Sequence, residues 1–556
     1  MKWGNRNKKY ICLESYDFCG RAQQKVPVIL HLIMKNRNTV QSKSALISLF
    51  KEYLNGNKGF YLFVLVATLF FSVFISPADF LNNPISNGKD LVIILSHWLV
   101  VLFATLGFIY LISINKYLFA LIFPLFMFLN SVLAFFRYTA NVSLTPMLVD
   151  ASLHNDLRSS LDLVSTNLIL YVIIICAVSI CLIVFRFKRV KPSFPILHMA
   201  LSISIIVIFT TCIGAFIRPI SERLPYITYF ATKKYFDGKE IIHKNRPSIS
   251  DDAKTTEDSL VVVLVIGEAL RPDHLSLNGY QRETTPLLSK AGVISMPNIY
   301  SEYTYTDASI PYILSRADSA HPGLAFSEPS FIGFFNNSGY QTTWIANQEP
   351  ANSFIFFINE CKDVVYANMS KNNYNFDLWL DETMLPYVDE SLKNQNPKQL
   401  LILHTIGSHW WYNSHFTEEF TRYKPIIRSR VISSNTPQEM INSYDNTVLY
   451  TDYFVAEVIT RLRDKNAILI FQSDHGELLG EGGKWLHAAE GLQLHQPAVF
   501  VWMSEKYKLK NHEKFEFLKQ NASKRYRSDF LFHSILDAAN IQSKNFVKAR
   551  SIFYNK

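Results

Sequence analysis

Residues 260–268 read LVVVLVIGE, an unbroken apolar run that ends in a glycine and a carboxylate. Three further short apolar runs follow it, at Leu400–His404, Ala467–Phe471 and Ala498–Trp502. Strands that are apolar throughout are covered on both faces, as in a parallel sheet flanked by helices. Amphipathic helices are predicted at Asn446–Arg463 and Asp529–Ala539. We therefore expect an α/β domain with a mostly parallel central sheet over residues 259–556.

The first part of the chain is apolar in a different way. Five apolar blocks lie at Gly59–Ser76, Leu91–Ile112, Tyr117–Tyr138, Ser165–Phe185 and Ile196–Ile217. Each has about 18–22 residues, enough to cross a hydrocarbon core of ~30 Å. None has an acidic residue in its interior, whereas helices of soluble proteins show a polar face. The pattern predicts an α-helical membrane domain of five spans over residues 59–217, followed by a linker along the membrane surface over 218–258.

The net charge of +9 is concentrated on one side of this membrane domain. Lys and Arg crowd residues 1–58 and the loop Arg186–Lys191, while the loops Pro77–Asp90 and Thr139–Val164 hold few. By the positive-inside rule, the N-terminus and the Arg186–Lys191 loop face the cytoplasm. Five crossings then place the α/β domain in the periplasm of a bacterium, as part of a multi-pass inner-membrane protein. This distribution of charge argues against nucleic acid as a partner.

The basic segment of residues 1–58 contains no signal-peptide pattern, because its apolar stretch Val26–Met34 is short and has no small-residue cleavage site. Met34 is followed by a basic, polar run that leads directly to the first span. We hypothesise that Met34 is the true start and that residues 1–33 are an extension of the gene model. Peptides from residues 1–25 recovered from the purified protein would contradict this.

Two predicted strands are followed by residues of the types that commonly bind metal ions. Leu260–Ile266 runs into Gly267-Glu268, and Ala467–Phe471 runs towards Asp474-His475. Ligand-binding loops of α/β sheets follow the carboxyl ends of strands. Two carboxylates and an imidazole suit zinc with one position left open. Of the six cysteines, only Cys361 lies in the α/β domain, so the sequence predicts no disulfide within that domain. A metal ion there would be held by oxygen and nitrogen ligands.

Between these strands lies a hydroxyl-rich loop, residues 303–311, which reads YTYTDASIP. A divalent cation bound to an alcohol lowers its pKa and makes it a competent nucleophile. Ser309 and Pro311 are typical of a helix start, as N-cap and first-turn proline. A hydroxyl just ahead of such a start lies where backbone N–H groups bind phosphate. The alternative is that Thr304 and Thr306 are only caps or turn residues.

In this arrangement the residues resemble the bacterial phosphoethanolamine transferases, which modify lipopolysaccharide and include the mobile colistin-resistance enzymes. The similar motifs are residues 267–274, 277–286, 403–409 and 443–452, Ser473-Asp474-His475-Gly476-Glu477 and Leu486-His487. The resemblance implies an alkaline-phosphatase-like (sulfatase-type) domain with one or two zinc ions, held by Glu268, Thr306, Asp474 and His475. It implies that Thr306 is the nucleophile and carries phosphoethanolamine as a phospho-threonine. His409 and His487 match positions that contact the phosphoryl group or serve acid–base steps; a buried structural role is the alternative for each.

The chain departs from the best-known members around the nucleophile. Those members have Cys-Gly ahead of the loop and a Cys after the proline, where this chain has Glu302-Tyr303 and Tyr312. We therefore expect packing, instead of disulfides, to hold the loop. The cysteine-poor domain is more similar to the branch that modifies core sugars than to the lipid A branch.

The resemblance implies transfer of phosphoethanolamine from phosphatidylethanolamine to lipopolysaccharide, on a core sugar, Kdo or lipid A. A phosphoglycerol transferase acting on a glucan or teichoic acid is the first alternative. The second is a non-catalytic membrane scaffold with a decayed hydrolase domain, although that predicts loss of a metal ligand and none is missing. The loop that contains Asn155, Asp156 and Asp162 is expected on the same side of the membrane as the α/β domain. These residues either contact the cationic headgroup of the lipid donor or belong to a solvated loop.

Overall fold

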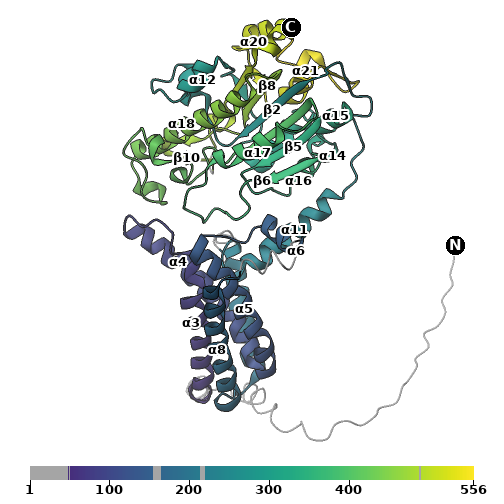
Figure 1. Cartoon of the computed structure of the whole chain (residues 1–556). Helices are drawn as coiled ribbons and strands as arrows, with labels where there is room; N and C mark the ends of the chain where they lie inside the picture. The colour runs from purple at the N-terminus through teal and green to yellow at the C-terminus, as the bar shows by residue number, and fades with distance from the viewer. Residues whose placement is uncertain (1–47, 49, 155–163, 213–219, 488–489, 556) are drawn as a thin grey trace, which may run out of the picture.

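The computed structural model describes residues 48, 50–154, 164–212, 220–487 and 490–555. A stem of long helices carries a larger α/β domain (Figure 1). Nearly all of the basic segment before the first span, including Met34, lies outside the described residues, and so do Asn155, Asp156 and Asp162.

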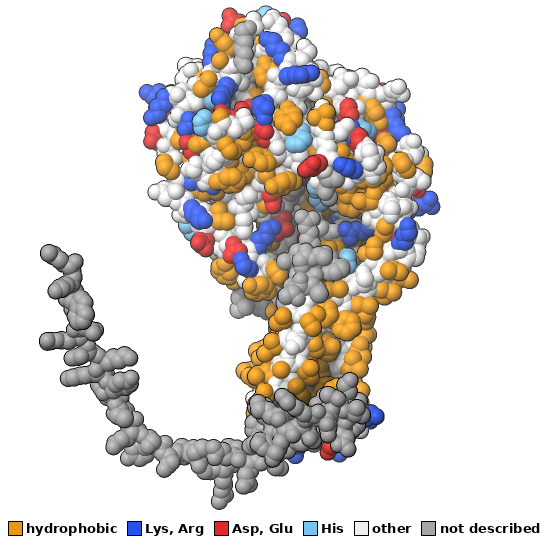
Figure 2. All heavy atoms as spheres, turned by 180° about the vertical axis from the view of Figure 1, so that it is seen from behind, with side chains coloured by type: hydrophobic (Ala, Val, Ile, Leu, Met, Phe, Trp, Pro, Cys, Tyr) orange, Lys and Arg blue, Asp and Glu red, His pale blue; other side chains and the backbone are white. Residues whose placement is uncertain are grey.

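In the described part of the stem, four helical spans are long and apolar enough to cross a membrane. They are α3 (Lys58–Phe74) together with η1 (Ser76–Asp79), α4 (Gly88–Ile114), α5 (Lys116–Ala140) and α8 (Thr166–Arg189). The fifth expected span coincides with α9 (Pro195–Cys212), whose described apolar stretch is shorter than those four. On the face shown in Figure 2, the described side chains of the stem are mostly hydrophobic, whereas charged ones are spread over the α/β domain. This surface is typical of a helical bundle in contact with lipid.

Two shorter helices, α6 (Pro146–His154) and α11 (Ile227–Ile242), lie between the stem and the α/β domain (Figure 1). α11 begins just after Leu224-Pro225, as expected from the missing N–H of proline. Tyr229 and Phe236 on this helix are 62% and 57% exposed. Three further aromatic residues of the connector, Tyr226, Phe230 and Tyr235, are partly buried.

The α/β domain is built on a seven-stranded sheet in the order β3-β11-β8-β2-β7-β5-β6. Its strands are β2 (Leu260–Gly267), β3 (Ile294–Ser295), β5 (Gln341–Ala346), β6 (Asp363–Tyr366), β7 (Lys398–His404), β8 (Ala467–Ser473) and β11 (Val499–Met503). The five strands from β8 to β6 are parallel, and β3 and β11 pair antiparallel with their neighbours. The expectation that the strand near Ala498–Trp502 runs parallel is therefore wrong. Only short elements connect β8 to β11, and a parallel return requires a crossover, usually a helix.

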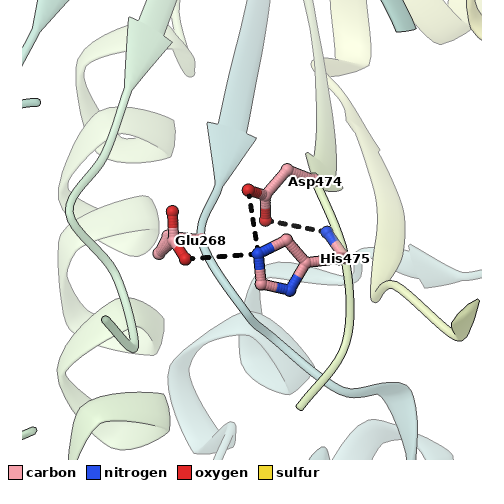
Figure 3. A group of neighbouring side chains, drawn as sticks. All are labelled: Glu268, Asp474 and His475. Atoms are coloured by element: carbon pink, nitrogen blue, oxygen red, sulfur yellow. Dashed lines mark hydrogen bonds and ion pairs between the residues drawn. The ribbon is translucent and has the colours of Figure 1, made fainter. Parts of the chain in front are cut away.

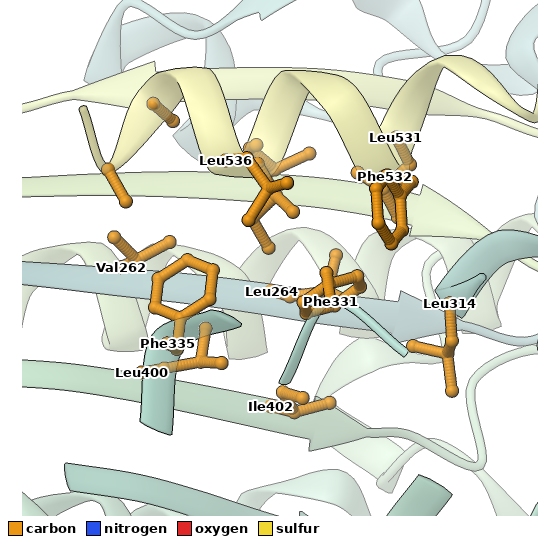
Figure 4. Close-up of a cluster of buried hydrophobic side chains, with 14 of the residues drawn as sticks. Val262, Leu264, Leu314, Phe331, Phe335, Leu400, Ile402, Leu531, Phe532 and Leu536 are labelled. Carbon is orange, nitrogen blue, oxygen red and sulfur yellow. The ribbon is translucent and has the colours of Figure 1, made fainter. Parts of the chain in front are cut away.

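Both faces of the sheet are covered, which confirms the interpretation of the apolar runs. In β2, Val262 and Leu264 face a cluster with α15 (Ile332–Asn337) and α21 (Phe530–Ala538), shown in Figure 4. The intervening Val261, Val263 and Val265 pack on the other side with α18 (Pro437–Leu462). Every residue of β2 is buried, because alternate side chains enter two separate cores.

Polar contacts join the stem to the α/β domain. Arg137 of α5 forms a buried ion pair with Asp79 (Nε–Oδ1 3.2 Å) and donates to the carbonyl oxygen of Tyr374 (2.7 Å). Ser143 donates its N–H to the carbonyl of Ser370 (2.7 Å) and its hydroxyl to Asn375 Oδ1 (2.9 Å). We call these the junction contacts. They anchor the segment 370–375 of the α/β domain to the end of α5.

Candidate active site

The carboxyl ends of β2 and β8 lie side by side, because these strands are parallel neighbours and Gly267 aligns with Ser473. Glu268 and Asp474 follow directly, so the topology brings the two carboxylates together. A Cβ atom on Gly267 would lie 2.3 Å from the Phe471 ring of β8. Glycine is therefore required where the two strands end.

Glu268, Asp474 and His475 converge in one buried group, shown in Figure 3. His475 Nε2 lies 3.5 Å from Glu268 Oε1 and 3.4 Å from Asp474 Oδ2. The other Asp474 oxygen, Oδ1, accepts from the N–H groups of Ala269 (3.1 Å) and His475 (2.8 Å). Burial, followed by the nearby Glu268 charge, raises the pKa of Asp474. A cation would relieve this crowding of carboxylates.

The hydrogen bonds of His475 support the fit to a metal ion. Its Nδ1 lies 2.7 Å from the carbonyl oxygen of Gly476, and since a carbonyl only accepts, Nδ1 carries the proton. Nε2 therefore presents a lone pair to the two carboxylates. Both Nε2 and Glu268 Oε1 are buried without a hydrogen-bond partner among the described residues. A zinc ion satisfies such unpaired acceptors around one point, and the Gly476 carbonyl fixes the orientation of the imidazole.

Thr306 lies against this group. Its Oγ1 is 2.7 Å from Asp474 Oδ2 and 3.2 Å from Glu268 Oε2. Thr306 is the first residue of α13 (Thr306–Leu314), after the extended Tyr305. The expectation that Ser309 caps this helix is wrong: the Tyr305 carbonyl accepts from the Ser309 N–H (3.1 Å), so the first turn forms earlier. Thr306 thus occupies the helix N-terminus itself, where free N–H groups favour a phosphate.

His409 and His487 line the same cleft as Thr306. Burial, reinforced by the nearby His487, lowers the pKa of His409 to about 4, so this imidazole is neutral at pH 7. Burial also opposes the charged form of His487, but Glu477, with Oε1 3.5 Å from Nδ1, outweighs it and raises the pKa to about 9. One neutral and one cationic imidazole therefore line the cleft that contains Thr306.

The cleft has a volume of about 700 Å³ and opens between the catalytic loops and the membrane-side helices. The stem side contributes Pro146 of α6, and Phe230 and Lys234 of α11. The α/β domain contributes Thr306 and Lys371, among others. Thr306 therefore shares a cleft with helices that lie next to the stem.

Gln348 belongs to the site but was missed from the sequence. Its Nε2 donates to Glu268 Oε2 (2.9 Å) and to the Thr405 carbonyl (2.6 Å), which orients the carboxylate. Gln348 follows β5, another parallel strand of the sheet. The run Thr342–Ala346 was the signal that would have located it, as a third strand end beside the metal ligands.

The nucleophile loop is held by packing, as expected. The Tyr303 and Tyr312 rings meet edge to face with centroids 5.3 Å apart. Tyr312 is 2% exposed and packs with Ala317 and Ala325. These contacts connect the two ends of the loop.

Comparisons with known proteins place the α/β domain in a known family. A family model described as Sulfatase matches residues 261–541, just over half of the 556 residues. Phosphoethanolamine transferase EptA of Escherichia coli is 30% identical over 305 residues, 52% of this chain and 55% of that protein. The Kdo(2)-lipid A phosphoethanolamine 7''-transferase of Escherichia coli is 35% identical over 263 residues, 45% of each chain. Phosphatidylethanolamine transferase Mcr-1 of Escherichia coli is 27% identical over 446 residues, 73% of this chain and 81% of that protein.

Solved structures show the same fold. The soluble domain of lipooligosaccharide phosphoethanolamine transferase A from Neisseria meningitidis has a TM-score of 0.50 and 28% identity, over 56% of this chain and 97% of that one. The integral membrane form of that protein has a TM-score of 0.50 and 23% identity over 88% and 98% of the two chains.

The fold and the strand-end site thus define a sulfatase-type domain on a helical membrane stem. Within that superfamily, the chain belongs to the phosphoethanolamine transferase family. The chain spans about half the length of the first curated relatives that it matches.

Proposed function

We propose that this protein transfers phosphoethanolamine from phosphatidylethanolamine to lipopolysaccharide at the outer face of a bacterial inner membrane. The observation that carries the proposal is Thr306: its hydroxyl lies against Glu268 and Asp474 and lines a cleft that opens beside the membrane stem. An alcohol fixed beside carboxylates at a helix N-terminus is suited to attack a lipid phosphodiester.

Glu268, Thr306, Asp474 and His475 would hold a zinc ion. When bound, zinc supplies Lewis-acid stabilisation of charge on the threonine oxygen and on the phosphoryl oxygens. Asp474 lies close enough to Thr306 Oγ1 to accept its hydrogen bond (2.7 Å), and its other oxygen is fixed by two backbone N–H groups. This fixes the direction of the attacking oxygen.

The transfer takes two displacements at phosphorus. Thr306 Oγ1 bonds to the phosphorus of the donor, the bond to the diacylglycerol oxygen breaks, and diacylglycerol leaves with a proton. An acceptor oxygen then attacks the phospho-threonine and restores the Thr306 hydroxyl. Cationic His487 is placed to stabilise phosphoryl charge, and neutral His409 to take a proton, at the wall of the cleft.

The stem supports the membrane part of this proposal. We propose that α9 completes a five-span domain with the four longer helices, residues 59–217, and that residues 218–258 lie along the membrane surface. The periplasmic domain is then residues 259–556. The exposed rings of Tyr229 and Phe236 suit the headgroup level. A site tethered at this height gains proximity to both lipid substrates. The acceptor on lipopolysaccharide is a core sugar, Kdo or lipid A.

Mass spectrometry of lipopolysaccharide tests the proposal. Cells that express the protein should add a phosphoethanolamine increment, and cells that express Thr306→Ala at the same level should not. Fragmentation locates the acceptor. An increment of phosphoglycerol would favour the glycerol-transferring alternative, and an increment that persists in Thr306→Ala would refute the role of this hydroxyl.

A further inference from the structure

Two residues flank the nucleophile in the chain, and both line the same cleft. Tyr305 precedes Thr306 and is 51% exposed. Asp307 follows Thr306, is exposed, and also lines the cleft. An aromatic ring and a carboxylate thus line the same cleft as the hydroxyl proposed to attack phosphorus.

Asp307 differs from the other carboxylates that line the cleft in the described part of the chain. Glu349 pairs with Lys234 (3.0 Å), and Asp237 pairs with Lys233. Glu222 accepts from the side chain of Asn373 (3.4 Å). For Asp307, beside the nucleophile, no ion pair is present among the described residues. Its charge is therefore available to a ligand.

The carboxylate of Asp307 beside Thr306 disfavours binding of a phosphate ester that carries no positive charge. The phosphoryl oxygens must approach Thr306, which brings their negative charge close to Asp307. A donor that carries its own cation nearby relieves this repulsion. In phosphatidylethanolamine, one oxygen and two carbons separate the phosphorus from the ammonium nitrogen, so the ammonium lies within reach of residues adjacent to Thr306. In phosphatidylglycerol a neutral diol occupies that place.

We propose that Tyr305 and Asp307 select the donor headgroup by binding its ammonium group. The inference rests on the proposed function and deepens it, because it assigns headgroup specificity to residues outside the metal ligands. The Asp307 carboxylate pairs with the ammonium, and the Tyr305 ring offers a face to the same cation. Neutral headgroups receive no such contact and leave the carboxylate next to the phosphate, so selection is by attraction and by repulsion.

A stabilising role in α13 is the plain alternative, because an acidic residue in a first turn interacts favourably with the helix dipole. The two roles differ in what they change. Loss of helix stability lowers the rate with every donor in proportion, whereas loss of ammonium binding changes the ratio between donors.

A competition assay measures that ratio directly. Full-length protein is placed in vesicles that contain equal amounts of phosphatidylethanolamine and phosphatidylglycerol with different acyl chains. The two diacylglycerols released are counted by mass spectrometry. We expect wild type to favour phosphatidylethanolamine, and Asp307→Asn to reduce this preference by roughly threefold to tenfold, the range for a partly exposed charge pair with a cation–π contact.

Matched variants complete the test. Asp307→Glu should keep the preference, Tyr305→Phe should keep it, and Tyr305→Leu should reduce it. Glu505→Gln removes a carboxylate from the first turn of α19 (Glu505–Lys510), far along the chain from the site, and should leave the ratio unchanged. Thermal unfolding of each variant identifies any loss of folded protein. Such a loss lowers both reactions equally and leaves the ratio of the two released diacylglycerols unchanged.

The proposed function and the selection of the donor by Tyr305 and Asp307 can be refuted separately. A wild-type protein that shows no preference for phosphatidylethanolamine would overturn the proposed function together with this selection. A wild-type preference that persists in both Asp307→Asn and Tyr305→Leu would overturn the selection alone.

Discussion

Gly476→Ala is expected to disable the site without touching a metal ligand. Gly476 follows His475, and its carbonyl accepts the hydrogen bond that fixes the His475 ring. Its N–H donates to the Leu494 carbonyl (2.9 Å), which holds the loop against the short helix η10 (Leu492–His495). A Cβ atom here would lie 1.9 Å from the carbonyl oxygen of Gln493 and 3.0 Å from that of Gln496.

The size of the effect follows from these distances. Relief of the contact with Gln493 to 3.0 Å, the lower limit for a Cβ atom, requires a shift of about 1 Å between two backbone segments. A misplacement of ~1 Å near a catalytic group costs about 100-fold in rate. Distortion around a ligating histidine also weakens metal binding by about 10- to 100-fold. Overpacking should lower the free energy of unfolding by about 1–3 kcal/mol.

The assay compares diacylglycerol release, zinc content and thermal unfolding in wild type, Gly476→Ala and Gly323→Ala. Gly323 is the matched control, since a Cβ atom there has no neighbour within 4 Å among the described residues. We expect all three quantities to fall in Gly476→Ala and to stay near wild type in Gly323→Ala. Retention of zinc by Gly476→Ala, with an activity within threefold of wild type, would contradict this expectation. That result would show that η10 moves to accommodate the added Cβ atom and that the site is not rigid.

Three further changes test separate contacts. Gln348→Leu removes the donor to Glu268 and should weaken zinc binding by about 10- to 100-fold, measured by competition with a chelator. Asp79→Asn leaves Arg137 buried without its ion pair and should destabilise the protein by about 3–5 kcal/mol, seen as a lower melting temperature in detergent; an unchanged value would contradict it. Burial raises the pKa of Glu360 from 4.5 to about 7, so the folded state binds this proton more tightly than the unfolded state does. The free energy of unfolding should therefore fall as pH rises from 4.5 to about 7. Glu360→Gln should remove a decline on the order of 2 kcal/mol between pH 5 and 8, measured by urea unfolding, and a parallel decline in the variant would count against Glu360.

The sequence predicted those parts of the site that follow from local patterns. Apolar runs ending in Glu268 and Asp474 identify strand ends, and a parallel sheet brings such ends to one edge. The structure indeed places these carboxylates beside His475 and Thr306. The roles assigned to these residues remain predictions until the experiments above are done.

Other features depend on contacts that local patterns do not encode. β5 begins with Gln341 and threonines, so it did not stand out as a buried strand, and Gln348 after it was missed. The start of α13 is set by the position of Thr306 against Asp474, which overrides the capping preference of Ser309. The antiparallel direction of β11 is set by the short elements that precede it.

Metal binding and access to the cleft are physically separable in this fold. The candidate metal ligands Glu268, Asp474 and His475 lie at the ends of β2 and β8, where backbone pairing of the two strands fixes their positions. The cleft wall instead includes Lys371 and Asn372, which lie in the segment that the junction contacts anchor to α5. Loss of a junction contact should therefore alter the wall of the cleft at Lys371 and Asn372 and leave the distances among Glu268, Asp474 and His475 unchanged, because β2 and β8 set those distances independently of the stem.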